Sequence, residues 1–324
     1  MHKVTVSAPG KLMLLGEHSV VYNRPCIVTA VGQRMFVTVE RIEDKIFELN
    51  APDVDIKKYK KAMEDLGEGE IPKGAKFVEI AVKNFKDKYF FKGGLKIKTK
   101  SEFSSKFGFG SSSASTVCVI KALSILLKGN LTDKQIFDLA YKTVLEVQGS
   151  GSGFDVAAAI YGGTLYFVTG GKKIEPLKLK DLPLIVGYTG IKADTPTIVK
   201  VIVGGLKEKY PKVVTNIFNQ ITDLVEQAKK AVIKKDWETV GQLMNINQGL
   251  LSSLGVSIRK LEDMIYAARD NGAYGAKLSG AGGGDCMIFL APQKKKAAIS
   301  RAIAKVGGKV INVKANVKGV RVER

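Results

Sequence analysis

Apolar and polar residues alternate through the first part of the chain, as they do in strands that bury one face. The alternation runs over residues 4–8 and ends at Pro9-Gly10, and a longer β-rich stretch covers residues 26–40 after a break at residues 23–25. Residues 95–99 alternate in the same way. These patterns predict a β-rich N-terminal region.

Helical patterns begin after a stretch rich in serine and glycine. An apolar segment over residues 114–127 predicts the first helix. Thr132 and Gln135 are spaced as a capping box, which predicts that a second helix begins there. Its apolar residues at helical spacing are Ile136, Leu139, Ala140 and Val144. Further strands are predicted over residues 163–168 and 184–188.

Amphipathic helices dominate the second part of the chain. Three of them are predicted over residues 195–209, 214–234 and 237–250. Ser257 is predicted to cap another helix, which ends before Gly272. A strand over residues 286–290, a last helix and two short strands complete the expected elements. The whole pattern predicts an α+β protein with two lobes.

The sequence contains no run of about 18 apolar residues, and its first residues lack the apolar core of a signal peptide. We therefore expect a cytoplasmic protein without a membrane-spanning helix. The three cysteines, Cys26, Cys118 and Cys286, lie far apart in apolar stretches and share no metal-ligand spacing. This favours a role for each as a small buried hydrophobic residue.

The chain carries a formal net charge of +20. Such a charge is typical of proteins that bind nucleic acids, but here the lysines are scattered, as at residues 57–61 and 294–296, without interleaved aromatic residues. A positive field also suits a small anionic substrate such as ATP. We therefore expect no nucleic-acid partner.

A glycine- and serine-rich loop, Gly108-Phe109-Gly110-Ser111-Ser112-Ser113-Ala114-Ser115, lies between a strand-like segment and a helix. Backbone N–H groups at a helix N-terminus, together with the helix dipole, form an anion site. Glycines let a phosphate approach the backbone, and a hydroxyl can bind Mg²⁺. The loop has neither the P-loop spacing nor the dinucleotide fingerprint, so the residues alone predict only an anion site.

Two further glycine-rich loops follow. The loop over residues 149–153 ends in Phe154-Asp155 and a run of small residues, so Asp155 stands at the start of a helix as a candidate general base or charge partner. An acidic residue at this place can also serve only to stabilise the helix. The loop over residues 280–284 is expected either to approach a ligand closely or to form a tight hairpin.

Three motifs in this order resemble those of the GHMP kinases, a family that includes galactokinase, homoserine kinase, mevalonate kinase and phosphomevalonate kinase. Ala8-Pro9-Gly10-Lys11 resembles the first motif, residues 108–115 resemble the second, and residues 277–286 resemble the third. The resemblance spans nearly the whole chain. It implies a two-lobed α+β fold, with an N-terminal lobe of ribosomal-protein-S5-like β-α-β topology over residues 1–185 and a ferredoxin-like α/β lobe over residues 186–324.

Different segments resemble different branches of the family. Gly16-Glu17-His18-Ser19-Val20-Val21-Tyr22, Thr189-Gly190 with Thr195, and residues 244–251 and 254–257 are similar to mevalonate kinases. Residues 151–159 and Gly284-Asp285-Cys286 are more similar to phosphomevalonate kinases. The resemblance therefore implies ATP-dependent phosphorylation of the 5-hydroxyl of mevalonate, with phosphorylation of 5-phosphomevalonate to the 5-diphosphate as the alternative.

The resemblance also implies roles for individual residues. ATP with Mg²⁺ would lie on the second motif, on Gly108, Gly110, Ser111, Ser112, Ser113 and Ala114. Asp155 would face the substrate hydroxyl as base or charge stabiliser, and Lys11 would stand between Asp155 and the phosphoryl group. The acceptor would contact Glu17, His18, Thr195 and Gly282.

The expected metal site is incomplete. Ser112 is placed to bind Mg²⁺, but the glutamate that helps to hold the metal in this family would fall at Val144. The nearest acidic residue is Glu146, and two residues correspond to roughly 200° of rotation around a helix. Glu146 is therefore only a weak metal candidate, and otherwise Ser112 and the phosphates hold the metal with waters.

Other functions fit the sequence less well. The related decarboxylases lack the lysine that Lys11 supplies in the first motif. A catalytically silent member that acts as a sensor is disfavoured because Lys11, Ser112 and Asp155 are all present. The sequence leaves a homodimer open.

Overall fold

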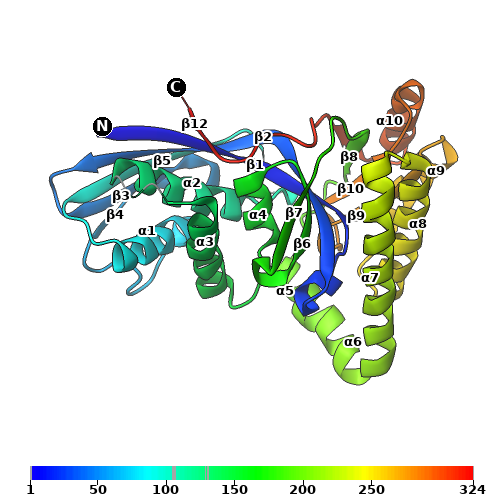
Figure 1. The fold of residues 1–324 in the computed structure, drawn as a ribbon, viewed down its shortest axis with the longest axis horizontal. Helices are drawn as coiled ribbons and strands as arrows, with labels where there is room; N and C mark the ends of the chain where they lie inside the picture. Colours follow the sequence, from blue (N-terminus) through cyan, green and yellow to red (C-terminus); the bar gives the residue numbers. More distant parts are fainter. Residues whose placement is uncertain (1, 104–106, 128, 130, 324) are drawn as a thin grey trace.

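The computed structural model describes residues 2–103, 107–127, 129 and 131–323, and two sheets form within them (Figure 1). In chain order, the larger sheet contains β1 (Lys3–Leu15), β2 (Pro25–Ile42), β3 (Ile46–Ala51), β4 (Ile56–Ala62), β5 (Gly94–Ser101), β6 (Thr164–Val168), β7 (Lys173–Leu177) and β12 (Arg321–Glu323). The strands follow the order β12-β1-β2-β5-β3-β4, and β6 pairs with both β2 and β7.

The long antiparallel pair of β1 and β2 is the centre of this sheet. Their register runs from Lys3 opposite Glu40 to Leu15 opposite Ile27, with a shift between Pro9 and Gly10. From Val6 onward every residue of β1 except Lys11 is buried. The irregularity comes directly before Lys11 and changes the direction of the strand there.

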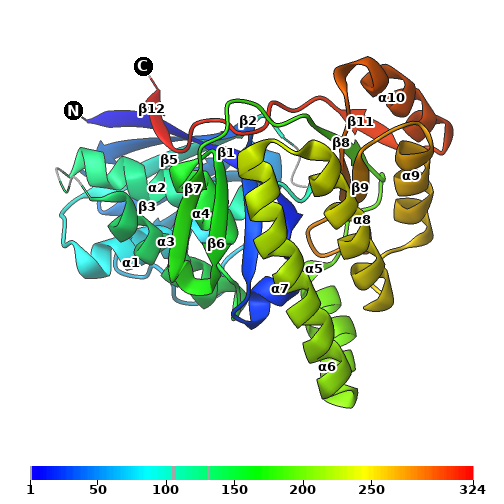
Figure 2. The same cartoon turned by 45° about the vertical axis from the view of Figure 1, so that its right-hand side comes forward.

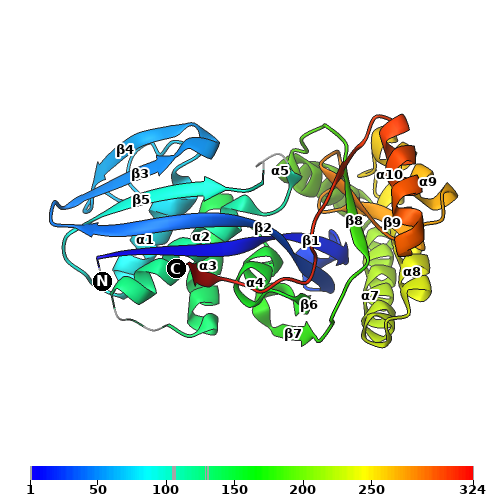
Figure 3. The same cartoon turned by 90° about the horizontal axis from the view of Figure 1, so that it is seen from above.

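Four helices cover one face of the larger sheet: α1 (Lys76–Lys88), α2 (Ser111–Leu126), α3 (Asp133–Gln148) and α4 (Phe154–Tyr161). Of these, α2 is buried on nearly all sides, which agrees with its continuous apolar sequence. Figure 3, viewed from above, shows the sheet lying over these helices. The arrangement fixes the N-terminus of α2 beneath β1.

The smaller sheet has the order β11-β8-β10-β9, and long helices pack beside it (Figure 2). Its strands are β8 (Leu184–Tyr188), β9 (Gly275–Ser279), β10 (Cys286–Leu290) and β11 (Lys309–Ile311). The helices of this lobe are α5 (Thr195–Thr197), α6 (Gly204–Lys209), α7 (Pro211–Lys234), α8 (Trp237–Ser253), α9 (Arg259–Asp270) and α10 (Lys296–Lys305). No helix of the described residues is both long and apolar enough to cross a membrane.

Most of the predicted elements are confirmed. The strands other than β1, and the helices over residues 114–127, 214–234 and 237–250, appear within a few residues of their expected bounds. The first strand was expected to end at Pro9-Gly10, but β1 continues through these residues to Leu15. The capping box also forms: the Gln135 amide donates to Thr132 Oγ1 at 3.3 Å, and the Thr132 amide donates to Gln135 Oε1 at 2.9 Å. The three cysteines are buried and free.

Three further expectations were wrong or incomplete. Residues 195–209 do not form one α-helix, because a π-helical segment, Ile198–Val203, separates α5 from α6. Ser257 does not cap α9: the cap position is Ile258, and Ser257 Oγ accepts a bond from Gln248 Nε2 instead. The pattern also left β3, β4, β7, β9 and α1 unassigned; β4 is a lysine-rich edge strand with little apolar periodicity.

The end of the chain returns to the larger sheet. β12 pairs antiparallel with β1, and isolated bridges join Val31 to Ala315 and Gly162 to Lys318. The smaller sheet begins at Leu184, next to the predicted boundary at residue 185. The division into domains at 185 stays a prediction, and the two sheets show that the tail crosses back over it (Figure 3).

Candidate active site

The first part of the site is the N-terminus of α2. Gly110 occupies its cap position in the left-handed region, with φ 79°, and no side chain caps the helix. The first intrahelical bond joins the Ala114 amide to Gly110 O, so the amides of residues 111–113 have no helical partner. These donors and the positive end of the helix dipole face the loop that contains Gly108 and Gly110.

Both glycines of the loop lie against charged side chains. A Cβ on Gly110 would be 3.2 Å from Lys11 Cε and 3.6 Å from Asp155 Cβ. A Cβ on Gly108 would be 2.7 Å from Asp285 Oδ2. Residues 104–106, which precede this loop, lie outside the described residues. The loop therefore brings three charged groups from distant parts of the chain around one helix end.

Lys11 follows the irregularity in β1 and is fixed by the loop. Its amide donates to Phe109 O at 3.0 Å, and its Nζ donates to Gly108 O at 2.8 Å. Burial lowers the pKa of Lys11 from its usual value, while the negative charges of Asp155 and then Asp285 oppose that shift. The Lys11 amine is thus partly buried and directed at the start of the loop.

Asp155 lies in the first turn of α4, next to the end of α2. Its Oδ2 accepts a 2.6 Å bond from Ser113 Oγ, and its Oδ1 accepts a 3.1 Å bond from the Val156 amide. The side chain is only partly buried. Ser113 therefore contributes its hydroxyl to Asp155 and leaves its backbone amide for the anion site.

A second polar region adjoins β1. The Glu17 carboxylate pairs with Lys277 Nζ, and both side chains are fully buried. Burial raises the pKa of Glu17 and lowers that of Lys277, and the opposite charge of the partner resists each shift. The other carboxylate oxygen of Glu17, Oε2, is buried without a hydrogen-bond partner in the structure.

His18 also has a buried polar atom without a hydrogen-bond partner among the described residues. Its Nε2 lies 2.9 Å from Ala281 O, so Nε2 carries the hydrogen, and its buried Nδ1 has no partner in the structure. Burial lowers the pKa of His18 to about 4, which leaves the ring neutral at pH 7. Glu17 Oε2 and His18 Nδ1 are thus two buried hydrogen-bond acceptors without a hydrogen-bond partner among the described residues.

In the third glycine-rich loop, residues 280–284, one glycine packs against the protein and another faces open space. Gly282 has φ 84°, and a Cβ there would lie 2.2 Å from Val256 O. Only glycine therefore lets this loop pack against the segment that precedes α9. Gly280 has φ 101°, and nothing lies within 4 Å of a Cβ built on it. This open space lies next to Ala281, whose carbonyl contacts His18. It favours the expectation that the loop approaches a ligand over the expectation that it is only a tight hairpin.

Comparison with known proteins identifies the family of the chain. Residues 76–163 match the family description "GHMP kinases N terminal domain", and residues 228–309 match "GHMP kinases C terminal". A mevalonate kinase of Thermococcus gammatolerans is 36% identical over 99% of this chain and 98% of that protein. The chain belongs to the GHMP kinase family.

Solved structures of the family extend the likeness to the fold. The Methanococcus jannaschii mevalonate kinase has a TM-score of 0.82 and 28% identity, with 97% of this chain and 98% of that chain covered. An L. major mevalonate kinase in complex with R-mevalonate has a TM-score of 0.77 and 27% identity, with 97% and 96% covered. The predicted GHMP kinase fold of class α+β is confirmed.

Among the described residues, no hydrogen bond joins two of the predicted residues of this GHMP kinase to the cluster. Thr195 opens α5 with an exposed side chain that makes no hydrogen bond in the structure. The Glu146 carboxylate is directed to α1, where it accepts a 2.9 Å bond from Asn84 Nδ2 and pairs with Lys83 at 3.3 Å. Val144 is buried, and its Cγ1 would be 3.4 Å from a Cβ on Gly151.

The protein itself offers few metal ligands. The described residues contain no group of three or more His, Cys, Asp or Glu side chains that could hold an ion. Ser112 lies in the first turn of α2, half-buried, with its carbonyl oxygen accepting bonds from the Ser115 and Thr116 hydroxyls. This donor set fits a cation held mainly by phosphates and water, with one protein hydroxyl beside them.

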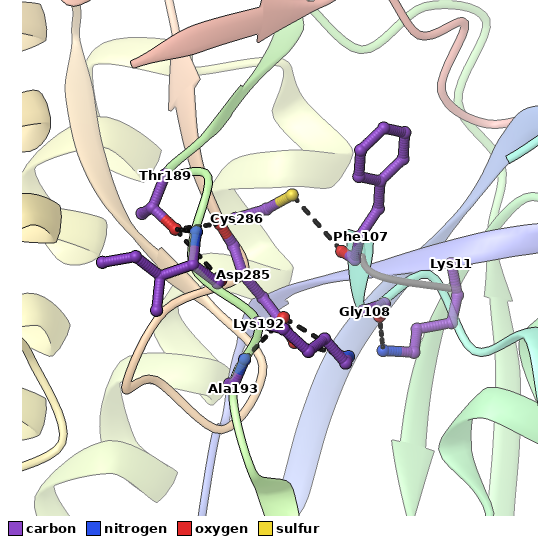
Figure 4. A network of polar contacts seen from close by, with 9 residues as sticks. Lys11, Phe107, Gly108, Thr189, Lys192, Ala193, Asp285 and Cys286 are labelled. Atoms are coloured by element: carbon purple, nitrogen blue, oxygen red, sulfur yellow. Dashed lines mark hydrogen bonds and ion pairs between the residues drawn. The ribbon is translucent and has the colours of Figure 1, made fainter. Parts of the chain in front are cut away.

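Sequence reasoning missed three charged residues of the site: Lys192, Lys277 and Asp285. Figure 4 shows Asp285 between Lys192 and the backbone of Ala193, beside Gly108 and Lys11. Lys277 and Asp285 belong to the third motif, so a motif was available to find them. Lys192 has no comparable local pattern, and only its neighbours in space identify it.

Proposed function

We propose that this GHMP kinase transfers the terminal phosphoryl group of ATP to the 5-hydroxyl of mevalonate and so makes 5-phosphomevalonate. The carrying observation is that Lys11, Asp155 and the N-terminus of α2 meet around Gly110. Relatives named mevalonate kinase that are 36% identical over 99% of the chain support this choice of acceptor.

The nucleotide phosphates fit the α2 end of the site. Free amides at residues 111–113, the helix dipole and the open backbone at Gly110 form a cradle for anionic oxygens. When bound, ATP supplies the phosphoryl group, and Mg²⁺ neutralises part of its charge beside the Ser112 hydroxyl. Glu146 is occupied by α1, so we propose that Ser112 is the protein's principal metal-side group.

Asp155 and Lys11 act on the reacting atoms. Ser113 and the Val156 amide hold the Asp155 carboxylate, which receives the proton of the acceptor hydroxyl or stabilises its positive charge as the bond forms. The Lys11 amine attracts that carboxylate and counters negative charge on the transferring group. Positioning and charge neutralisation are the main requirements of phosphoryl transfer.

The acceptor lies beside Glu17 and His18 in this proposal. Their two unpaired acceptor atoms suit hydroxyl groups of a small polyol acid, because each hydroxyl can donate one hydrogen bond. Thr195, which is exposed, would reach the acceptor from α5, while Gly282 shapes the loop that carries Ala281. A buried acceptor atom that gains no such hydrogen bond lowers stability, so a bound hydroxyl would be favoured here.

Phosphomevalonate kinase activity is the second candidate. The third motif places Asp285 at the site, a residue that gives this segment a resemblance to phosphomevalonate kinases. The test is to offer mevalonate and its 5-phosphate separately with Mg-ATP and to measure ADP release. ADP release with mevalonate alone supports the proposal, whereas release only with the 5-phosphate replaces it with the second candidate. Release with neither would remove both.

A further inference from the structure

Asp285 occupies an unusual backbone position for a side chain that faces the site. It has φ 51°, in the left-handed region, and the residue is 8% exposed. Its backbone is fixed on both sides, because its amide donates to Ile191 O at 2.7 Å and its carbonyl accepts from the Thr189 amide at 3.0 Å. The carboxylate is therefore held in one place beside Gly108.

That carboxylate holds Lys192. Lys192 Nζ lies 3.3 Å from Oδ1 and 3.4 Å from Oδ2, and Oδ1 also accepts a 3.0 Å bond from the Ala193 amide. The Lys192 side chain is 47% exposed, so a ligand can reach its amine. A lysine amine has three donors, and at least one remains available after contacts to two carboxylate oxygens.

The amine is directed at the phosphate loop. In Figure 4 the Lys192 side chain extends toward Gly108 and the amine of Lys11. The positive charge of Lys192 is also among the causes that lower the pKa of Lys11, as expected for two cations near one another. Lys11 and Lys192 thus approach the loop from different lobes, one from β1 and one from the segment after β8.

The ion pair of Lys192 and Asp285 changes the charge that an anion would meet beside Gly108. A carboxylate next to Gly108 would repel phosphates if it were alone, and an ion-paired lysine cancels that charge. We propose that Lys192 is a second phosphate-binding cation, which contacts the terminal phosphate of the nucleotide, and that Asp285 is the positioning residue that holds it there. This inference rests on the proposed nucleotide-dependent function.

The test measures nucleotide binding by calorimetry and, for turnover, the KM for mevalonate and for ATP by ADP release. ADP and a non-hydrolysable ATP analogue are titrated with Mg²⁺ by calorimetry against the wild type, Lys192→Gln, Asp285→Asn and the double variant. Asn tolerates left-handed backbone, so Asp285→Asn keeps the fold. Lys294→Gln, at an exposed lysine before α10, is the matched control, and thermal unfolding without ligand checks that each variant is folded.

Lys192→Gln is expected to weaken binding of the ATP analogue about tenfold to a hundredfold, because a hydrogen bond from a charged group is lost. Binding of ADP is expected to weaken less than about threefold. The double variant is expected to bind the analogue better than Lys192→Gln does, because no unpaired carboxylate then faces the phosphates. Asp285→Asn alone is expected to weaken the analogue about threefold to tenfold, because Lys192 is no longer held in place. Lys294→Gln is expected to bind both nucleotides as the wild type does.

Three results would overturn the inference. If Lys192→Gln changes the affinities for ADP and the analogue by the same factor, Lys192 does not contact the terminal phosphate. If the double variant equals the sum of the single variants, Asp285 does not act through Lys192. Failure of the wild type itself to bind either nucleotide would instead reject the proposed function, together with this inference. A rise in the KM for mevalonate alone would assign Lys192 to the acceptor.

Discussion

Asp155 is the residue on which the proposed chemistry depends most directly. Its two oxygens accept bonds from Ser113 Oγ and the Val156 amide, so its orientation is set before any substrate binds. A carboxylate fixed in this way can receive a proton without first reorganising. Ser113, although it lies in the phosphate loop, supports the acceptor side of the reaction through this contact.

Asp155→Asn is expected to lower kcat by about a hundredfold to ten-thousandfold, the usual contribution of a general base. The amide has the same shape and can still accept the Ser113 hydrogen bond, so the dissociation constant for ATP should stay within about threefold of wild type. Steady-state ADP release and nucleotide titration measure the two quantities. A variant that turns over at nearly the wild-type rate would remove Asp155 from the catalytic role.

His18, in the acceptor region, makes the stability of the fold depend on pH. Its pKa is lowered to about 4 from a usual value of 6.5, because burial disfavours the charged ring. Between those values the unfolded chain binds a proton that the folded protein does not. The contribution of His18 to stability is therefore complete above about pH 6.5 and is lost as the pH falls toward 4.

His18→Asn is expected to remove this part of the pH dependence, which is on the order of 3 kcal/mol at most across the window. Asparagine is chosen because it is among the side chains found most often at positive φ, and His18 has φ 60°. The free energy of unfolding in urea is measured for both proteins at several pH values from 4 to 7. Parallel curves for the two proteins would show that His18 does not titrate in this way.

At the scale of elements, the N-terminus of α2 carries the anion site, and Gly110 is its critical position. Gly110→Ala combines left-handed strain of about 1 kcal/mol with a Cβ placed 3.2 Å from Lys11 Cε. The displaced Lys11 and the narrowed cradle are expected to weaken binding of ATP about tenfold or more. Nucleotide titration and thermal unfolding are the two measurements.

Gly149→Ala is the matched control, because Gly149 also has a positive φ, 72°, but nothing lies within 4 Å of its Cβ position. The two variants should lose similar stability, while only Gly110→Ala loses affinity for ATP. Equal nucleotide affinities in both would mean that the space around Gly110 is not part of the phosphate site.

The elements that the sequence predicts well are those whose signals are local. The capping box at Thr132, the apolar α2 and the alternating β1 follow from neighbours within one or two turns. β4 escapes prediction because an exposed edge strand has no buried face to set a period. The π segment at Ile198–Val203 escapes because it is short and almost wholly apolar, so the sequence does not show that only Ile198 and Val203, five residues apart, are buried.

At the scale of the whole molecule, the site exists because β1 runs from the larger sheet to the smaller one. Ser279 Oγ bonds both the amide and the carbonyl of Met13, at 3.0 and 2.9 Å, and Cys286 Sγ donates to Phe107 O at 3.3 Å. These contacts join residues that are far apart in sequence. The motifs predict Lys11, Asp155 and His18 as site residues, but the position of Lys192 depends on this long-range packing.

Arg34 fastens the returning tail to the same framework. Its buried guanidinium donates to Ser7 Oγ at 2.6 Å, to Ser7 O at 2.9 Å, and to the carbonyl oxygens of Lys318 and Gly319 at 3.0 and 2.7 Å. These bonds hold the segment before β12 against β1. A methionine of similar length would fill the space but leave the three carbonyl groups without these donors.

Arg34→Met is therefore expected to lower the free energy of unfolding by about 3 kcal/mol and to expose the tail to limited proteolysis after residue 315. Arg24→Met is the matched control, since Arg24 makes one exposed bond, to Asn219 Oδ1 on α7, and should change stability by less than about 1 kcal/mol. Urea unfolding and the rate of tail cleavage are measured for both. If the tail of Arg34→Met resists cleavage as well as that of Arg24→Met, the tail is held mainly by its β12 pairing rather than by Arg34.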